Sequence, residues 1–344
     1  MRFGIRLRRL LLILATGVVI AAGALGGAWF WSADQLETAI AQWTTERTRE
    51  GYAIEYVGPA LGGFPFALTA TIAKPAVASP DGWHWQGPSL AAEAGVLKPL
   101  TPAFAFPGLH TVTVNHGDRT ETVELEMERG AAVAALRTDG TLESGATDMA
   151  ALTVRNHRFD RITVGRLRAE LGPIDRAPAP QDTRISFAGT ATDTMLPAHV
   201  ELPLGPAVQH ITLAGTLNGA LDGGPDAEAL AQWRDAGGTI DLHRGLLIWG
   251  PLEVDAKGAL SLDPEMRPLG ELTARLYGLN GTLDTLTRQG LIEPGQALAM
   301  ELLLLTLAGQ RDEQGRTFVT LPITLRNGWL SLGPVQLFPL APVL

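Results

Sequence analysis

The chain has 344 residues, a net charge of −9 and no cysteine, and it is rich in glycine (39) and proline (23). The acidic balance excludes a nucleic-acid-binding surface, which needs an excess of positive charge. The absence of cysteine excludes disulfides, a thiol nucleophile and cysteine-ligated metal or cluster sites. Only 18% of the residues are charged, and this low fraction together with many turn-forming residues favours short strands and tight turns over surface helices.

The first predicted element is a transmembrane helix over residues 10–31, an uncharged apolar run that directly follows four arginines within residues 1–9. A helix of this length covers about 33 Å, enough for the roughly 30 Å of bilayer hydrocarbon. Because arginines flank the run on one side only, we expect residues 1–9 to be a cytoplasmic tail and everything after residue 31 to lie across the membrane.

A cleavable signal peptide is the alternative for this run. Signal peptides have apolar cores of roughly 7–15 residues that are followed by a cleavage site between small residues. The run is longer and ends in Trp29, Phe30 and Trp31, bulky side chains that suit a membrane interface. These features favour an uncleaved anchor, while the small residues at 21–28 leave cleavage open.

A membrane-proximal helix is predicted next, within residues 32–51. Ser32 and Gln35 have the spacing of a capping box, apolar residues recur at helical intervals over residues 34–50, and Gly51 stands where a C′ residue belongs.

From residue 52 to residue 344 the sequence predicts a β-rich body. The apolar period changes from 3.6 to 2, which is typical of half-buried strands. Strands are predicted at 52–57, 66–72, 111–115, 121–128, 152–155, 161–170, 183–189 and 209–217. Seven Gly-Pro pairs are expected to end or bend strands, and the one at Gly58-Pro59 is expected to form a turn. No fixed repeat is present, so we predict a mainly β (α+β) fold with a long curved antiparallel sheet or a sandwich and a few packed helices.

The second half of the body continues this pattern with helices inserted. The segment 175–182 is predicted to be a linker or long loop with a domain sub-boundary. Helices are predicted at 226–236, 280–291 and 296–307, and strands at 239–249, 252–262, 269–277, 317–326 and 329–340. Asn327-Gly328 between the last two strands is typical of a hairpin turn.

The sequence contains no catalytic motif: it has no nucleophile elbow, no phosphate-binding loop and no dinucleotide-binding fingerprint. Its histidines lack metal-site spacing; they are His84, His110, His116, His157, His199, His210 and His243. His110 and His116 bracket a strand end, but a defined metal geometry needs a third ligand. Glu124, Glu126 and Glu128 alternate with apolar residues, which indicates a solvated sheet face. We therefore predict no catalytic, metal or cofactor site.

Trp83-His84-Trp85 is a local concentration of aromatic residues in the predicted body. One interpretation is a surface that touches lipid or an envelope partner. The favoured interpretation is a strand whose two tryptophans share a face and pack in the core.

Gly63-Phe64-Pro65-Phe66 and the ending LRNGWLSLGPVQLFPL at 325–340, together with the arginine-flanked run, resemble a bacterial family known only as domain of unknown function 2125. The glycine-punctuated strands at 238–262 and the closing hairpin are similar in style to AsmA-like envelope proteins. This second likeness implies a periplasmic body that is open along one side and that handles lipids or maintains the outer membrane. The family supplies no catalytic residues, so none is carried over.

The favoured function is a non-enzymatic envelope factor that is anchored in the bacterial inner membrane and binds lipid or an envelope protein. One alternative is a periplasmic hydrolase that acts on a glycan polymer with two facing carboxylates. Another is a secreted binding protein, released by signal cleavage. The sequence specifies neither the ligand nor the oligomeric state.

Overall fold

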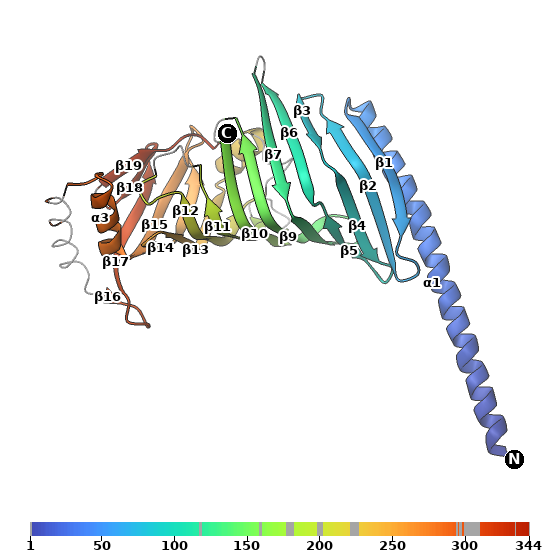
Figure 1. Cartoon of the computed structure of the whole chain (residues 1–344). Coiled ribbons are helices and arrows are strands. Elements are labelled where there is room, and N and C mark those ends of the chain that lie inside the picture. Colours follow the sequence, from blue (N-terminus) through green and yellow to red (C-terminus); the bar gives the residue numbers. More distant parts are fainter. Residues whose placement is uncertain are drawn as a thin grey trace. The chain divides into compact units, whose positions relative to one another are not determined.

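The computed structural model describes residues 2–343, apart from 117–118, 158–159, 177–181, 198–201, 221–226, 294, 296–297, 299–309 and 334. For residues 2–24 it describes the backbone alone. The chain divides into two compact units, Met1–Thr141 (unit 1) and Leu142–Leu344 (unit 2). Both are built on antiparallel strands (Figure 1), which confirms the predicted mainly β fold.

Unit 1 begins with the long helix α1 (Arg2–Arg49). The prediction that residues 34–50 are helical is confirmed, since they belong to α1 as far as Arg49. The predicted start of this helix with a capping box at Ser32 is wrong, because α1 is continuous through this position and has no end there to be capped. Gly51 ends α1 as predicted. It has a φ of 94°, and the N–H groups of Gly51 and Tyr52 donate to the carbonyl oxygens of Thr48 (3.1 Å) and Arg47 (3.0 Å), which is the Schellman arrangement.

The membrane anchor stays a prediction. Within the described part of the chain, no helix combines the length and the apolar character that a membrane crossing needs. Most of the predicted span, residues 10–24 of 10–31, has side chains that the structure does not describe.

The sheet of unit 1 divides into two branches. Its strands are β1 (Ala53–Gly62), β2 (Ala67–Ala78), β3 (Trp83–Gln86), β4 (Ser89–Gly95), β5 (Lys98–Ala105), β6 (Gly108–His116), β7 (Arg119–Met127) and β8 (Arg129–Leu136). One side of β2 pairs with β1, while its other side pairs with β4 along the first half and β3 along the second. One branch continues through β5 to β8 and the other through β6 to β7. The division lies at Pro75 and Pro88, neither of which can donate a ladder hydrogen bond. Their carbonyl oxygens accept hydrogen bonds from the backbone N–H groups of Gly87 (3.0 Å) and Lys74 (2.9 Å).

The two branches meet around His110, which is only 4% exposed. Its ring stacks on that of Trp85 at 5.9 Å, and its Nε2 lies 2.9 Å from the carbonyl oxygen of Phe106. Glycines allow this close approach: a Cβ on Gly87 would lie 2.5 Å from the His110 ring, and one on Gly130 would lie 2.5 Å from the Phe106 ring. The junction is therefore a small, tightly packed core.

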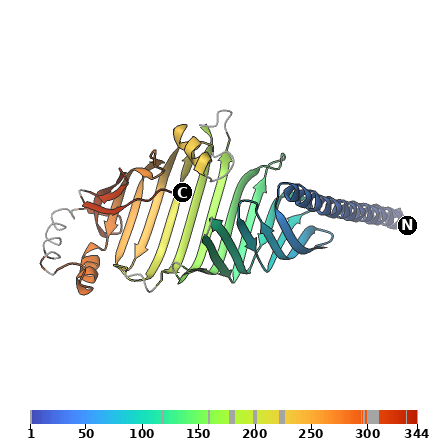
Figure 2. The same cartoon turned by 90° about the horizontal axis from the view of Figure 1, so that it is seen from above.

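Unit 2 is a sequential antiparallel meander. Its strands are β9 (Leu142–Asn156), β10 (Asp160–Asp175), β11 (Arg184–Met195), β12 (Ala207–Asn218), β13 (Thr239–Trp249), β14 (Leu252–Leu262), β15 (Pro268–Tyr277), β16 (Gln310–Arg311), β17 (Thr317–Arg326), β18 (Trp329–Leu332) and β19 (Val335–Pro339), and its helices are α2 (Ala227–Asp235) and α3 (Leu279–Arg288). Each strand from β9 to β15 pairs with the next, and β15 pairs with β17. Figure 2 shows these strands side by side, in green to orange.

Most predicted elements are present, with some corrections to their connections. Gly58-Pro59 is a bulge inside β1 and not a turn, because β1 resumes its pairing with β2 at Ala60 after a register shift. The segment 329–340 is two paired strands, since Gly333 with a φ of 56° turns the chain between β18 and β19. Asn327-Gly328 forms the predicted turn between β17 and β18, with positive φ at both residues.

Two predicted segments fall partly or wholly on residues outside the described part. They are the helix at 296–307 and the linker at 175–182, of which residues 177–181 are not described. The linker begins at Asp175, the last residue of β10, and ends at Asp182, just before β11 begins at Arg184; β10 and β11 pair with each other inside unit 2. The boundary between the two compact units lies between Thr141 and Leu142.

Candidate functional site

The register of unit 2 separates a polar face of the sheet from an apolar face. Residues that lie opposite each other on neighbouring strands share a face, and successive residues along one strand alternate between faces. The polar face includes Arg166, Arg168, Glu170, Arg184, Thr190, Thr212, Asp255, Lys257 and Arg275. The apolar face includes Leu167, Leu171, Phe187, Ile211, Leu213, Leu217, Leu247 and Val254. We refer to this second set as the apolar face.

The apolar face is continuous from β10 to β14. Leu167 lies opposite Ala191, Ala191 opposite Ile211, Ile211 opposite Leu247, and Leu247 opposite Val254. Neighbouring strands are about 4.8 Å apart, so these five residues form an apolar row about 20 Å long.

This face is only partly covered. Leu171 is 41% exposed and Leu213 is 49% exposed, while Leu167, Phe187 and Ile211 are half-buried. None of the large side chains among the described residues is completely buried. In a closed sandwich the side chains of two inner faces interdigitate and fill the core. The strip from β10 to β12 is therefore an accessible apolar surface and not the interior of a packed sandwich.

The same face is closed further along the sheet. Ala274 and Leu276 on β15 and Val319 and Leu325 on β17 are buried. The accessible part of the apolar face therefore ends before β15, where the residues on this face become buried.

A second apolar hollow lies in unit 1, between α1 and the sheet. It has a volume of about 450 Å³ and is lined by Trp43, Tyr52, Trp83, Trp85 and three further residues. Trp83 and Trp85 share a face, as their alternation predicted, since they lie opposite Val114 and Val112 on β6. Both line this open hollow and neither is fully buried, so the interpretation as core residues is only partly correct.

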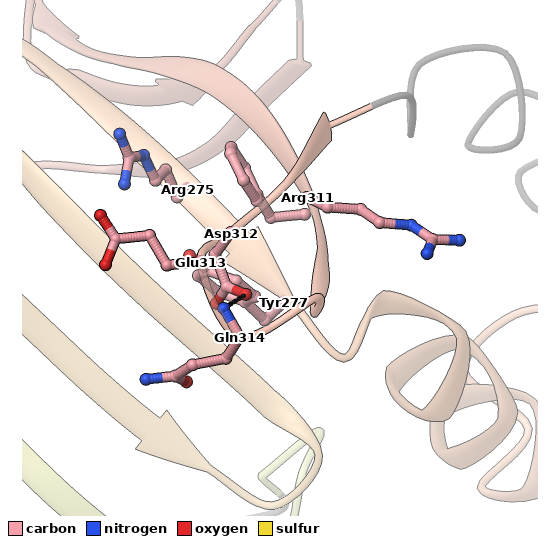
Figure 3. Close-up of a pocket in the computed structure, with 7 residues that line it drawn as sticks. Arg275, Tyr277, Arg311, Asp312, Glu313 and Gln314 are labelled. Atoms are coloured by element: carbon pink, nitrogen blue, oxygen red, sulfur yellow. Dashed lines mark hydrogen bonds between the residues drawn. The ribbon is translucent and has the colours of Figure 1, made fainter.

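Polar hollows lie on the other face of unit 2, and Figure 3 shows the one beside β15 and β16. The rings of Tyr277 and Phe318 contact each other at 5.4 Å, and the guanidinium of Arg316 lies 4.4 Å from the centre of the Tyr277 ring. In the figure Arg311 points away from Arg275 and Glu313. The Asp312 carboxylate of this hollow accepts hydrogen bonds from the backbone N–H groups of Gln314 (3.0 Å) and Arg316 (2.8 Å), which braces the β16–β17 turn.

Two turns of unit 2 use the same bracing motif, Asp-x-x-x-Arg. Asp263 accepts hydrogen bonds from the backbone N–H (2.8 Å) and Nε (2.8 Å) of Arg267, and Asp312 accepts the same two from Arg316 (2.8 Å each). Partial burial raises the pKa of each carboxyl, but the hydrogen bonds and charge of the arginine outweigh it and lower the pKa below its ordinary value. Both carboxyls are therefore structural anions and do not have the raised pKa of a general acid.

The histidines and carboxylates of the described residues are not grouped as a metal centre would require. His110 is a packed core residue, and His199 lies outside the described residues. Within the described ranges, no three His, Asp or Glu side chains are grouped so that they could hold a metal ion. Asp175, Asp182 and Asp241 line one open hollow, but the hydrolase alternative stays a prediction.

Comparison with known proteins identifies one family. Searches of curated proteins and of solved structures gave no significant match. The comparisons do not show the looser likeness to AsmA-like envelope proteins. A family model described as an uncharacterised protein conserved in bacteria (DUF2125) matches residues 29–341, nearly the whole chain. The resemblance carried by Gly63-Phe64-Pro65-Phe66 and by the ending at 325–340 is thereby confirmed, and the chain belongs to the DUF2125 family.

Proposed function

We propose that this chain is a non-enzymatic protein of the bacterial envelope, anchored in the inner membrane, whose apolar face in unit 2 binds lipid acyl chains. The observation that carries the proposal is the partly exposed apolar face from β10 to β12, which includes Leu171 and Leu213. Soluble proteins rarely leave a contiguous apolar surface of this kind uncovered unless it binds something.

An acyl chain fits this surface better than a polar substrate does. The row of Leu, Ile, Phe and Val side chains offers no hydrogen-bonding group, so it favours ligands that gain from leaving water. Each methylene group that it takes up contributes about 0.8 kcal/mol. The charged residues nearest to Leu167, which are Arg166 and Arg168 on β10, lie on the opposite face of the sheet.

The anchor part of the proposal depends on the sequence. The apolar run at residues 10–31 is long enough to span a bilayer, and the arginines before it direct the N-terminus to the cytoplasm. The body would then stand in the periplasm. Membrane fractionation followed by N-terminal analysis tests this: an intact Met1 in the membrane fraction supports the anchor, and a mature chain that starts beyond residue 21 would establish the secreted alternative.

Photolabelling tests lipid binding. The full chain in mixed micelles is irradiated with a phospholipid that carries a diazirine on its acyl chain, and the labelled peptides are mapped by mass spectrometry. We expect label on the β10–β13 peptides of the wild type. Leu213→Lys, which places a charge on the apolar face, should lose that label, while Thr212→Lys on the opposite face of the same strand should keep it. Label confined to residues 10–31 would refute lipid binding by the body.

A further inference from the structure

A group of exposed apolar side chains lies at one end of unit 1. At this end the turn between β1 and β2 contacts α1, and the turn between β4 and β5 lies beside it. We call this group the turn patch, and it consists of Phe30, Phe64, Phe66 and Leu97. Phe64 is 57% exposed, Phe66 72% and Leu97 83%. Figure 1 shows α1 running along β1 and then continuing beyond this end of the strands.

The turns are fixed to the helix and to each other. The indole N–H of Trp29 donates to the carbonyl oxygen of Ala67 (2.7 Å), and the ring of Phe64 contacts those of Trp29 (5.5 Å) and Phe30 (5.8 Å). The backbone N–H of Val96 donates to the carbonyl oxygen of Phe66 (3.0 Å), which ties the β4–β5 turn to the β1–β2 turn. The exposed rings are therefore held in place by ordered contacts.

Phe64 also touches the apolar run itself. A Cβ at Gly26 would lie 3.6 Å from the Phe64 ring. Gly26 precedes the end of the run by five residues, or about 7.5 Å of helix. If residues 10–31 span a bilayer, Phe64 lies at the depth where interfacial side chains are buried, about 5–10 Å below the headgroup boundary.

The charges around the patch fit a lipid surface. In a chain of net charge −9, the residues around the two turns, 58–72 and 94–107, contain no Asp or Glu, and their single charged residue is Lys98. A carboxylate there would be costly to bring into an interface, whereas a lysine can direct its amine to the headgroups while its alkyl stem stays apolar.

From these observations we propose that the turn patch inserts into the interface of the bilayer from which α1 emerges, so that unit 1 is attached to the membrane by two turns as well as by its helix. This inference rests on the anchor in the proposed function. It predicts that unit 1 keeps a fixed height above the bilayer and does not hang from a single helix.

The absence of cysteine makes the test direct. Single cysteines are introduced by Phe66→Cys and Leu97→Cys, labelled with an environment-sensitive fluorophore, and the full chain is reconstituted in phosphatidylethanolamine–phosphatidylglycerol vesicles that contain a nitroxide-labelled lipid. We expect the lipid nitroxide to quench most of the fluorescence at both positions. The control is Asp81→Cys, at the opposite end of β2 and about 40 Å away along the strand, which should remain unquenched.

A fourth label separates the two proposals. Ala21→Cys lies inside the apolar run and reports on the anchor alone. Quenching at residue 21 without quenching at residues 66 and 97 would refute the turn patch and leave the anchor intact. The absence of quenching at residue 21 would refute both.

Discussion

Unit 1 and unit 2 are both antiparallel and both lack disulfides, yet they cover their sheets differently. Unit 1 divides its sheet at Pro75 and Pro88 and packs the two branches against each other around His110. Unit 2 keeps its strands in one sequential meander and leaves the apolar face from β10 to β12 partly exposed. A similar alternation of residues thus gives a small core in one unit and an accessible surface in the other.

The difference indicates that the residues that stabilise unit 2 are not the ones that we propose bind lipid. Burial of apolar area is the main favourable contribution to folding, so a surface left open contributes less than it could. The closely packed residues of unit 2 include Trp233 in α2 and Leu276 in β15, which are buried. The mutations below test this contrast, from the largest expected effect to the smallest.

Trp233→Ala should have the largest effect on unit 2. Trp233 is 3% exposed, and its indole N–H donates to the carbonyl oxygen of Asn218 (2.8 Å). Loss of this side chain should lower the free energy of unfolding by about 3–5 kcal/mol, measured by urea denaturation. Trp329→Ala is the matched control, because Trp329 is an exposed tryptophan in the same unit. If Trp233→Ala and Trp329→Ala lowered the free energy of unfolding equally, the stability of unit 2 would not depend on its buried residues.

Gly87→Ala tests the tight junction of unit 1. The added methyl group would lie 2.5 Å from the His110 ring, which is held between Trp85 and Phe106. Because the neighbours cannot move freely, we expect a loss of about 1–3 kcal/mol from overpacking. Gly95→Ala, whose added methyl group would lie 3.8 Å from its nearest neighbour, the backbone nitrogen of Lys98, should change the urea midpoint little. A tolerated Gly87→Ala would show that the branches are loosely packed.

Asp263→Asn tests the braced turn between β14 and β15. Since the pKa of Asp263 is lowered in the folded protein, its carboxylate adds stability above its unfolded pKa, about 3.9, and loses that contribution as the pH falls through the folded value. We expect the variant to lose about 1 kcal/mol at pH 7 and to be less sensitive than the wild type to acidification below about pH 4.

Urea midpoints at pH 7 and at pH 3 measure this difference. Glu265→Gln in the same turn is the control, because the Glu265 carboxylate is exposed and its ion pair with Arg267 is expected to contribute little. If the wild type and Asp263→Asn lose stability in parallel on acidification, the brace does not depend on the charge of Asp263.

Leu213→Ala should have the smallest effect on stability. Leu213 is 49% exposed on the apolar face, and complete burial of a leucine is worth about 1.5–3 kcal/mol. We therefore expect a loss of about 1 kcal/mol or less, together with weaker photolabelling by the diazirine lipid. A loss as large as that of Trp233→Ala would mean that the face is packed in solution.

Local features of the sequence predicted the elements well. Alternation of apolar residues located strands such as β6, β7, β13, β14 and β17, because side chains in a strand alternate between its faces. Residues that favour positive φ located the end of α1 at Gly51 and the turn at Asn327-Gly328. Alternation missed β4 and β8, whose sequences SLAAEAG and RGAAVAAL are rich in alanine, a residue with weak strand preference.

The sequence by itself determined the fold class, the family and most strand positions, since these depend on residues close together in the chain. Only the tertiary structure decided which strands pair with β2, that Phe64 lies against Gly26, and that Leu171 and Leu213 stay accessible. Alternation shows that a strand has an apolar face, but the partner that covers this face is set by contacts between distant residues.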